Sequence, residues 1–444
     1  MLMGNYQVIA DELAAEINAG RLRPGQRLPP QRRFARQHGI ASSTASRVYA
    51  ELVRRGLVTG EVGRGTFVRA GTAAPEPALA EPATARVDLE LNVPVLADQG
   101  AVLAAGLARM TRPDVLANGL RPIGAAGTEA ARRATAALLA RAGWAPDPRH
   151  VLFAGNGRQA IAAALAAVVP AGERLGVERF TYPVVRSIAA RLGIRLVPLD
   201  MDEHGVLPQA VTEASPLRAV YLQPAVHNPL GTTLPEHRRA VLARVLREAD
   251  LCAIEDSVYG FLSTDLPPLA ARAPERTILV DSLSKRVAPG LTLGFLVAPP
   301  AMVPSVASAL RSGGWAATRF PLEVATGWMT EGTVTSLSRA KFLDATERQR
   351  IAAAQLAGFT VRADPHGYHC WWELPPPWRA DTFVAAAARH GVAVTPAAAF
   401  TVDPGHAPGA VRLALGSPGH DVLAEALGTL AALARTSPED VVTE

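Results

Sequence analysis

The sequence of 444 residues has very little lysine and cysteine, and no apolar run long enough to cross a membrane. Its two cysteines, Cys252 and Cys370, are too few for a disulfide framework or a zinc cluster. The longest apolar run, residues 160–169, is about half of the ~20 residues that span a bilayer. Asp11 and Glu12 lie near the start, without the basic flank or cleavage site of a secretory signal. We therefore expect no membrane segment, no metal site and a cytoplasmic location.

Positive charge is carried almost entirely by arginine. Lysine and arginine together number 45, and only Lys285 and Lys341 are lysines. A lysine amine can form a Schiff base with an aldehyde, whereas a guanidinium cannot. The two lysines are therefore the candidates for covalent chemistry of this kind.

The positive charge is also unevenly distributed along the chain. Residues 1–69 carry 11 arginines and five acidic residues, a net charge of +6, whereas the whole chain has +5. The remaining residues are therefore close to neutral. A small basic module on a neutral body favours a polyanionic partner.

Composition divides the chain into two parts joined by a linker. Residues 71–87, GTAAPEPALAEPATARV, are rich in Ala, Pro and Glu and show no apolar periodicity. Such composition is typical of an extended, semi-stiff linker. We therefore expect one domain over residues 1–70 and a second over residues 88–444. The apolar content of 49% is high enough for both to fold.

The first domain has the pattern of three helices followed by a hairpin. Helices are expected over residues 8–17 and 30–38, and a third, which Ser42 or Ser43 can cap, is expected to run through Arg55. Short strands are expected at 57–58 and 66–68. This order predicts a winged helix-turn-helix. The side chains expected in its core are Phe34, Ala35, Ala45, Val48, Tyr49 and Leu52.

A winged helix-turn-helix of this composition has the residues needed to bind DNA. The third helix would enter a major groove with Ser43, Thr44 and Arg47 exposed. Arg32 on the preceding helix could clamp the DNA backbone, and Arg64 at the wing tip could enter the minor groove. The alternative is a solvated basic surface on a protein-binding winged helix.

A resemblance to a known family favours DNA. Residues 20–68, GRLRPGQRLPPQRRFARQHGIASSTASRVYAELVRRGLVTGEVGRGTFV, resemble the GntR-type DNA-binding domain. The resemblance implies double-stranded operator DNA as the partner. Pro30 departs from the family pattern, which usually has Ser at that position.

The second domain alternates apolar strands with helical stretches. This alternation predicts an α/β domain with a mostly parallel sheet, and ligands bind such sheets where the strands end. The expected strands are residues 151–153, 174–177, 195–199, 219–222, 252–255, 277–280 and 294–297.

Polar side chains follow these strands one after another. They are Gly157, Arg158, Tyr182, Asn228, Asp256, Tyr259, Ser282, Ser284 and Lys285. Each alone has a plainer explanation, such as a helix cap, an Asx turn, packing or a solvated lysine. Together they supply what a pyridoxal phosphate site needs: an imine-forming lysine, a carboxylate for the ring nitrogen, donors for the 3′-hydroxyl, an aromatic ring and a phosphate nest.

The same stretches resemble a known enzyme fold. From about residue 90 to the end the chain resembles a fold-type I aminotransferase, most specifically in AVHNPLGTTLP, IEDSVYGF and DSLSKRVAPGLTLGFLVAP. With its GntR-type head it resembles the MocR subfamily of transcriptional regulators. The fold class implied is α/β, a winged helix-turn-helix joined to a fold-type I PLP-dependent aminotransferase-like domain. The resemblance also implies a homodimer.

The resemblance assigns a role to each matching residue. It implies that Lys285 is the Schiff-base lysine, Asp256 the partner of the pyridine nitrogen and Tyr182 the ring-stacking aromatic. Contacts to the 3′-oxygen are implied for Asn228 and Tyr259, and phosphate contacts for Ser282, Ser284, Gly157 and Arg158. Arg412 in AVRLALG is implied to bind the carboxylate of a substrate or effector.

Two positions lie outside the family pattern. Family members usually have an arginine within APGLRLG, where this chain has Thr292. Either a neighbour such as Arg286 compensates, or the cofactor phosphate is held less tightly. Lys341 matches no motif and is expected on the surface.

The sequence favours a pyridoxal phosphate-dependent transcriptional regulator. We expect it to bind an operator as a homodimer, and to sense a small amino compound or pyridoxal phosphate itself. The alternative is an active aminotransferase with an accessory DNA-binding domain, which would use the same site.

Overall fold

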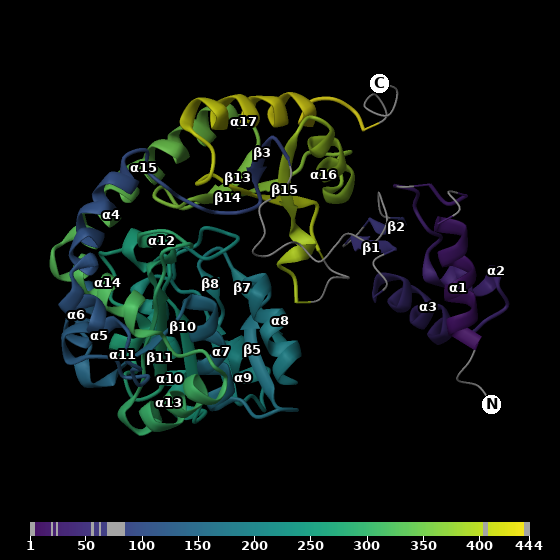
Figure 1. Cartoon of the computed structure of the whole chain (residues 1–444). Coiled ribbons are helices and arrows are strands. Elements are labelled where there is room, and N and C mark those ends of the chain that lie inside the picture. Colours follow the sequence, from purple (N-terminus) through teal and green to yellow (C-terminus); the bar gives the residue numbers. More distant parts are fainter. Residues whose placement is uncertain are drawn as a thin grey trace.

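The computed structural model describes residues 5–18, 21–23, 25–54, 57–61, 64–68, 85–402 and 407–438. Figure 1 shows a small N-terminal head, in purple, beside a larger body built on two sheets. Most of the predicted linker and Gly63 of the predicted wing turn lie outside the described residues. Val87, the last residue of the predicted linker, already begins a strand of the body.

The head folds as the winged helix-turn-helix that the sequence predicts. Its described elements are α1 (Asn5–Asn18), α2 (Gln31–Gln37), α3 (Ser42–Arg54) and the antiparallel strands β1 (Val58–Glu61) and β2 (Gly65–Val68). The side chains expected in the core, Phe34, Ala35, Ala45, Val48, Tyr49 and Leu52, are buried. Because the buried side chains of α3 lie on one side of the helix, its other side is open to a partner.

Two details of the head depend on how its helices begin. The predicted serine cap of α3 is wrong, because the helix starts at Ser42 and the first backbone bond runs from Ala45 N–H to Ala41 O. α2 begins after Pro30, which forms no side-chain cap bond. A serine there, as in the family pattern, could cap the helix.

The large sheet of the body has the strand order β4-β12-β11-β10-β9-β5-β6. Its strands run parallel except for β12, which is antiparallel to both neighbours. Each expected strand is present to within two residues. The strands are β4 (Val151–Ala154), β5 (Arg174–Glu178), β6 (Arg195–Leu199), β9 (Ala219–Leu222), β10 (Cys252–Asp256), β11 (Thr277–Ser282) and β12 (Gly294–Val297).

Helices cover both faces of the large sheet. Successive strand residues point to opposite faces, so Leu152 packs in one apolar cluster with α7 and α13, whereas Phe153 packs in another with α6 and α14. The helices of this part are α4 (Gln99–Leu107), α5 (Pro113–Gly119), α6 (Glu129–Leu139), α7 (Gly157–Val168), α8 (Pro183–Leu192), α9 (Pro208–Glu213), α10 (Glu236–Glu248), α11 (Leu269–Arg272), α12 (Leu283–Arg286), α13 (Val303–Ser312) and α14 (Arg319–Thr330). A short ribbon of β7 (Met201–Asp202) and β8 (Gly205–Val206) follows β6.

The second sheet of the body has the order β13-β14-β16-β15-β3. Its apolar core packs against three helices, which Figure 1 shows above the large sheet. The strands are β3 (Val87–Leu89), β13 (Thr360–Ala363), β14 (His369–Glu373), β15 (Val392–Pro396) and β16 (Ala410–Ala414), and the helices are α15 (Thr333–Gln355), α16 (Ala380–Arg389) and α17 (His420–Ala434). β3 pairs in parallel with β15, so the chain enters the body at the edge of this sheet.

Arg379 is a side chain of the body that contacts the head directly. Arg379, just before α16, donates a hydrogen bond to the carbonyl of Gly25 at 3.0 Å. Its guanidinium also lies over the ring of Phe67 on β2, 3.9 Å from the ring centre. A cation over an aromatic face is attractive, so this arginine joins the wing to the body of the same chain.

Candidate functional site

A cavity of about 370 Å³ lies where the strands of the large sheet end. The segment that follows β3, residues 90–93, forms one wall. The cavity is lined by every residue of the body for which the sequence predicted a ligand role: Gly157, Arg158, Tyr182, Asn228, Asp256, Tyr259, Ser282, Ser284, Lys285 and Arg412. Residues far apart in sequence therefore meet at one place, as the strand-end rule requires.

Lys285 enters the cavity from α12, directly after β11. Its Nζ donates a hydrogen bond to the backbone carbonyl of Asn92. Burial lowers the pKa of the Lys285 amine to about 7, and the positive charges of Arg412 and Arg158 contribute to this lowering. A large share of the amine is therefore unprotonated at neutral pH, the form that attacks a carbonyl carbon.

Asp256 lies at the end of β10 in the floor of the cavity. Tyr221 Oη donates to its Oδ2 at 2.5 Å and Gln223 Nε2 at 3.3 Å, while the Val258 N–H donates to Oδ1 at 3.1 Å. Burial raises the pKa of this carboxyl group, and these hydrogen bonds oppose the rise. A cation placed beside it would favour the ionised form.

Asn228 and Tyr259 also line the cavity. Among the described residues, the buried Oδ1 of Asn228 has no hydrogen-bond partner. Tyr259 Oη accepts a hydrogen bond from Asn92 Nδ2 at 2.9 Å, and burial raises the pKa of its phenol. Tyr182 caps α8 beside them. A polar ligand atom would satisfy the Asn228 amide.

Small residues and hydroxyls line another part of the cavity. Asn156 caps α7 by accepting from Gln159 N–H at 2.9 Å, which leaves Gly157 at the helix start. Ser282 Oγ donates to Ser284 Oγ at 3.0 Å, and Ser284 Oγ lies 2.8 Å from Thr292 Oγ1. Hydroxyls beside a helix N-terminus suit an anionic group.

Close packing requires glycine in this part of the cavity lining. A Cβ on Gly294 would lie 2.2 Å from the Asn156 carbonyl oxygen. A Cβ on Gly157 would lie 3.0 Å from Ser282 Oγ. The two glycines therefore let the α7 turn approach β12 and the serine cluster.

The structure shows where Arg286 lies and which side chains surround Thr292. Arg286 does not line the cavity, because its guanidinium binds the buried carboxylate of Asp281 at 2.9 Å and lies over Phe261. Thr292 joins the serine hydroxyls instead, and Arg158 lines the same cavity. Compensation by Arg286 is therefore wrong for this conformation.

Arg412 projects from β16 toward the segment that follows β3. Its Nη2 donates to the Glu90 carbonyl at 2.5 Å and to Thr395 Oγ1 at 3.0 Å, and the guanidinium lies 5.1 Å from the Phe400 ring centre. Its buried Nε has no hydrogen-bond partner among the described residues. An anion entering the cavity would find this donor available.

Sequence reasoning missed several residues that complete the site. Lys341, expected on the surface, is 0% exposed and donates to the backbone at Lys285, so that expectation is wrong. Asn92, Tyr221 and Gln223 hold the predicted residues in place. Their only sequence signal is a polar side chain beside an apolar strand, which is common in loops.

The predicted DNA contacts of α2 and α3 lie at the surface of the head, whereas Arg64 of the wing lies next to the body, since a Cβ on Gly409 would be 3.9 Å from its Nη1. Arg32, Ser43, Arg47 and Arg64 are exposed and Thr44 is half-buried. One side of α3, with Ser43 and Arg47, therefore faces solvent, while the side with Ala45, Val48 and Leu52 packs in the core. This placement suits insertion of α3 into a groove.

The described residues contain no group of three or more His, Cys, Asp or Glu that could hold a metal ion. Across the same described ranges, no helix is long and apolar enough to cross a membrane.

Both parts of the chain match known families. Residues 120–430 match the family described as aminotransferase class I and II. Residues 5–68 match the bacterial regulatory proteins of the gntR family. The two matches cover the body and the head respectively.

Whole-chain relatives combine the same parts. The chain is 30% identical over 425 residues to the uncharacterized HTH-type transcriptional regulator YdeF of Bacillus subtilis (strain 168), covering 93% of this chain and 90% of the relative. It is 26% identical over 385 residues to the probable rhizopine catabolism regulatory protein MocR of Rhizobium meliloti, covering 79% and 76%. A solved structure of LysN, the α-aminoadipate aminotransferase of Thermus thermophilus in complex with N-(5′-phosphopyridoxyl)-L-leucine, matches with a TM-score of 0.71 at 22% identity, covering 80% of this chain and 93% of that one.

Proposed function

Because the chain belongs to the MocR subfamily of GntR-type transcriptional regulators, we propose that it binds double-stranded operator DNA and that a small molecule controls this binding. The head would bind the DNA. The body would hold pyridoxal phosphate and sense an amino compound, or pyridoxal phosphate itself. The observation that carries the proposal is the meeting of Lys285, Asp256 and Arg412 in one cavity of a chain with a DNA-binding head.

The residues of the cavity fit pyridoxal phosphate. Asn228 Oδ1 and Gln223 Oε1 are buried without hydrogen-bond partners among the described residues, and Gly157 leaves room beside Ser282. The LysN structure, of similar fold, contains a phosphopyridoxyl compound. When bound, the cofactor would supply an aldehyde that condenses with amines and a ring that withdraws electrons.

Each part of the cavity would hold one part of the cofactor. Asp256 would keep the pyridine nitrogen protonated, with Tyr221 and Gln223 orienting the carboxylate. Tyr182 would cover the ring face. The remaining contacts would be made by Asn228 and Tyr259 at the 3′-oxygen, and by Gly157, Arg158, Ser282, Ser284 and Thr292 at the phosphate.

Lys285 would attach the cofactor covalently. Its neutral amine condenses with an aldehyde and releases one water, so the proton must leave Nζ first. The lowered pKa of about 7 makes this form abundant at neutral pH, and attachment should slow as the pH falls below that value. Arg412, which lines the same cavity, would bind the carboxylate of an amino ligand.

The experiment that tests the body is borohydride reduction of the full chain incubated with pyridoxal phosphate. A pyridoxyl label should appear on Lys285 and be absent from Lys285→Ala. A wild-type chain that acquires no label on Lys285 would refute this half of the proposal.

The experiment that tests regulation is operator binding titrated with candidate amino compounds and with pyridoxal phosphate alone. A change in DNA affinity with an amino compound identifies it as an effector, and a response to pyridoxal phosphate alone identifies the cofactor as the signal. No response to either would leave the body without a regulatory role and contradict the proposal.

An active aminotransferase remains the second candidate, because the match to aminotransferase class I and II covers most of the cavity. The names of the whole-chain relatives favour regulation. Incubation with amino acids and a keto-acid acceptor separates the two, since an enzyme makes product over many turnovers and a sensor does not.

The proposed regulator would act as a homodimer, so that two heads can bind two half-sites of one operator. Sedimentation at micromolar concentration should then give twice the chain mass of 46.6 kDa. A monomer that still binds the operator would contradict this part of the proposal.

A further inference from the structure

Lys341, the second lysine of the chain, lies against the first. Its side chain is fully buried on α15, and its Nζ donates hydrogen bonds to the carbonyl oxygens of Lys285, at 3.1 Å, and of Val287. A buried ammonium is costly unless its N–H groups are bonded. These two hydrogen bonds therefore satisfy N–H groups of an ammonium that the fold encloses.

The two carbonyls belong to the end of the helix that carries Lys285. α12 ends at Arg286, and Val287 caps it. Carbonyls in the last turn of a helix lack partners within the helix and favour a nearby cation. Gln99 Nε2 donates to the Val287 carbonyl as well, at 2.9 Å. Lys341 and Gln99 thus hold the backbone immediately after Lys285.

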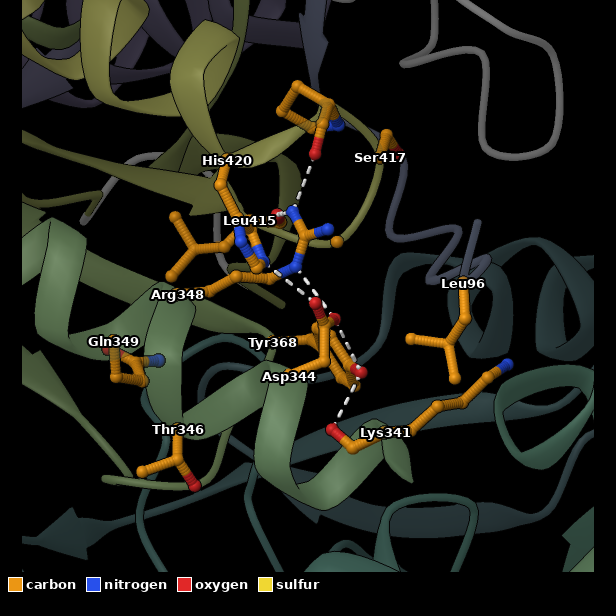
Figure 2. Close-up of polar contacts among 12 residues, drawn as sticks. Leu96, Lys341, Asp344, Thr346, Arg348, Gln349, Tyr368, Leu415, Ser417 and His420 are labelled. Carbon is orange, nitrogen blue, oxygen red and sulfur yellow. Dashed lines mark hydrogen bonds and ion pairs between the residues drawn. The ribbon is translucent and has the colours of Figure 1, made fainter. Parts of the chain in front are cut away.

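A polar network fixes the part of α15 that carries Lys341. Figure 2 shows Tyr368 beside Asp344, with its Oη donating to the Lys341 carbonyl at 2.7 Å and to Asp344 Oδ2 at 2.9 Å. Arg348 Nε donates to the same carboxylate at 2.8 Å, and Arg348 Nη1 to the Leu415 carbonyl at 2.5 Å. The position of Lys341 is therefore tied to the loop that follows β16, the strand of Arg412.

Resting on the proposed role of Lys285, we propose that Lys341 is a positioning residue for it. Lys341 fixes the backbone from which Lys285 enters the cavity and adds a positive charge to those of Arg412 and Arg158 that act on that amine. Figure 2 shows its side chain extending from α15 toward Leu96, away from Thr346.

The charge of Lys341 acts on the same amine. Burial lowers the pKa of Lys341 to about 8, with Asp344 opposing the shift, so it is mostly protonated at neutral pH. Burial is the main cause of the lowered pKa of Lys285; the charges of Arg412, Arg158 and Lys341 lower this pKa further, and Asp256 opposes the shift. Removing the charge of Lys341 alone should therefore raise the pKa of Lys285.

The test is the pH profile of Lys285 acetylation by trace acetic anhydride, measured on the labelled peptide in the full chain without pyridoxal phosphate. In Lys341→Met the profile should move to higher pH. A rise of ~0.5 units would lower the labelling rate at pH 6 about threefold. Lys341→Arg keeps the charge and should stay near the wild-type profile.

A second variant and a matched control separate this role from general stability. Lys341→Gln keeps a donor without the charge and should show the same shift, so it replaces Lys341→Met if that variant does not fold. Arg239 is another buried cation bonded to backbone carbonyls, those of Leu234, Pro267 and Pro224. Arg239→Met should lower the Tm without moving the Lys285 profile.

Unchanged Lys285 profiles in both uncharged variants would overturn the positioning role. The acetylation uses no pyridoxal phosphate, so its result stands whether or not the wild type acquires a pyridoxyl label. Failure of the proposed function and failure of this inference are therefore seen in different experiments.

Discussion

The head and the body place their functional charges in opposite surroundings. Arg32, Arg47 and Arg64 of the head are exposed, whereas Lys285 of the body is half-buried and Arg412 is buried, both among polar partners. Exposed cations interact with any polyanion that approaches, and salt screens them. Buried ones respond only to groups that enter the cavity. The head is therefore suited to DNA and the body to one small ligand.

This difference in exposure predicts that mutations in the two regions lower the stability of the protein by different amounts. An exposed arginine can be removed with little loss of stability, because surface ion pairs contribute about 0–1 kcal/mol. A buried charge shares hydrogen bonds with backbone and side chains, so its removal leaves partners unsatisfied. Variants in the two regions should consequently separate DNA affinity from ligand response.

Lys285→Ala should produce the largest effect, a complete loss of the pyridoxyl label after borohydride reduction. Basal operator binding should stay within about twofold of the wild type, because the head does not depend on this amine. Loss of operator binding in a folded Lys285→Ala chain would break the division between head and body.

Arg412→Ala should weaken binding of a carboxylate-bearing amino ligand by about 30-fold, the ~2 kcal/mol of a charge-assisted hydrogen bond. The pyridoxyl label on Lys285 should persist. Titrating the ligand-dependent change in operator binding measures the effect, with Arg412→Lys as the charge-retaining control. An identical response in wild type and Arg412→Ala would exclude Arg412 as the carboxylate site.

Arg47→Ala should lower operator affinity and reduce the slope of log affinity against log salt by about one unit if the guanidinium contacts a phosphate. Arg133→Ala provides the control, because Arg133 is an exposed arginine of the body, paired with exposed Glu129. Equal salt slopes in the two variants would show that α3 does not meet the DNA through Arg47.

Arg379→Ala should have the smallest effect. It removes the hydrogen bond to Gly25 and the contact with Phe67, which together stabilise the docked head by ~1–2 kcal/mol. Amide exchange around Gly25 and β2 should become faster, with the large sheet unchanged. Arg362→Ala, which loses only an exposed ion pair with Glu373, should leave exchange in the head unaltered. Unchanged exchange around Gly25 in Arg379→Ala would show that this arginine does not hold the head on the body.

The elements of the fold follow closely from local sequence. Apolar periodicity locates α1 to α3, and the strand predictions for the large sheet fall within two residues of the structure, because each depends on a few neighbouring side chains. The predicted serine cap of α3 is wrong because Ser42 is itself the first residue of the helix and not the residue that caps it. The two arrangements differ by one backbone hydrogen bond, from Ala45 N–H to the Ala41 carbonyl.

The cavity was predictable only in part, for a physical reason. Strand-end residues such as Asn228 and Asp256 could be named because parallel strands end at one edge. Asn92 and Lys341 belong to segments whose position depends on how α15 and the second sheet pack on the first. Their sequence neighbours carry no trace of that packing, so an isolated lysine was placed on the surface.

The wall of the cavity is also the chain's route toward the head. Glu90 and Asn92, whose carbonyls accept bonds from Arg412 and Lys285, follow β3 directly, and β3 follows the segment that leads from the head. Any coupling carried along this route obeys thermodynamic reciprocity. A ligand that weakens operator affinity about tenfold must itself bind about tenfold less tightly to the DNA-bound protein. Operator DNA would thus act as an effector of the cavity, and the concentration of ligand that triggers a response would depend on how many operators the cell presents.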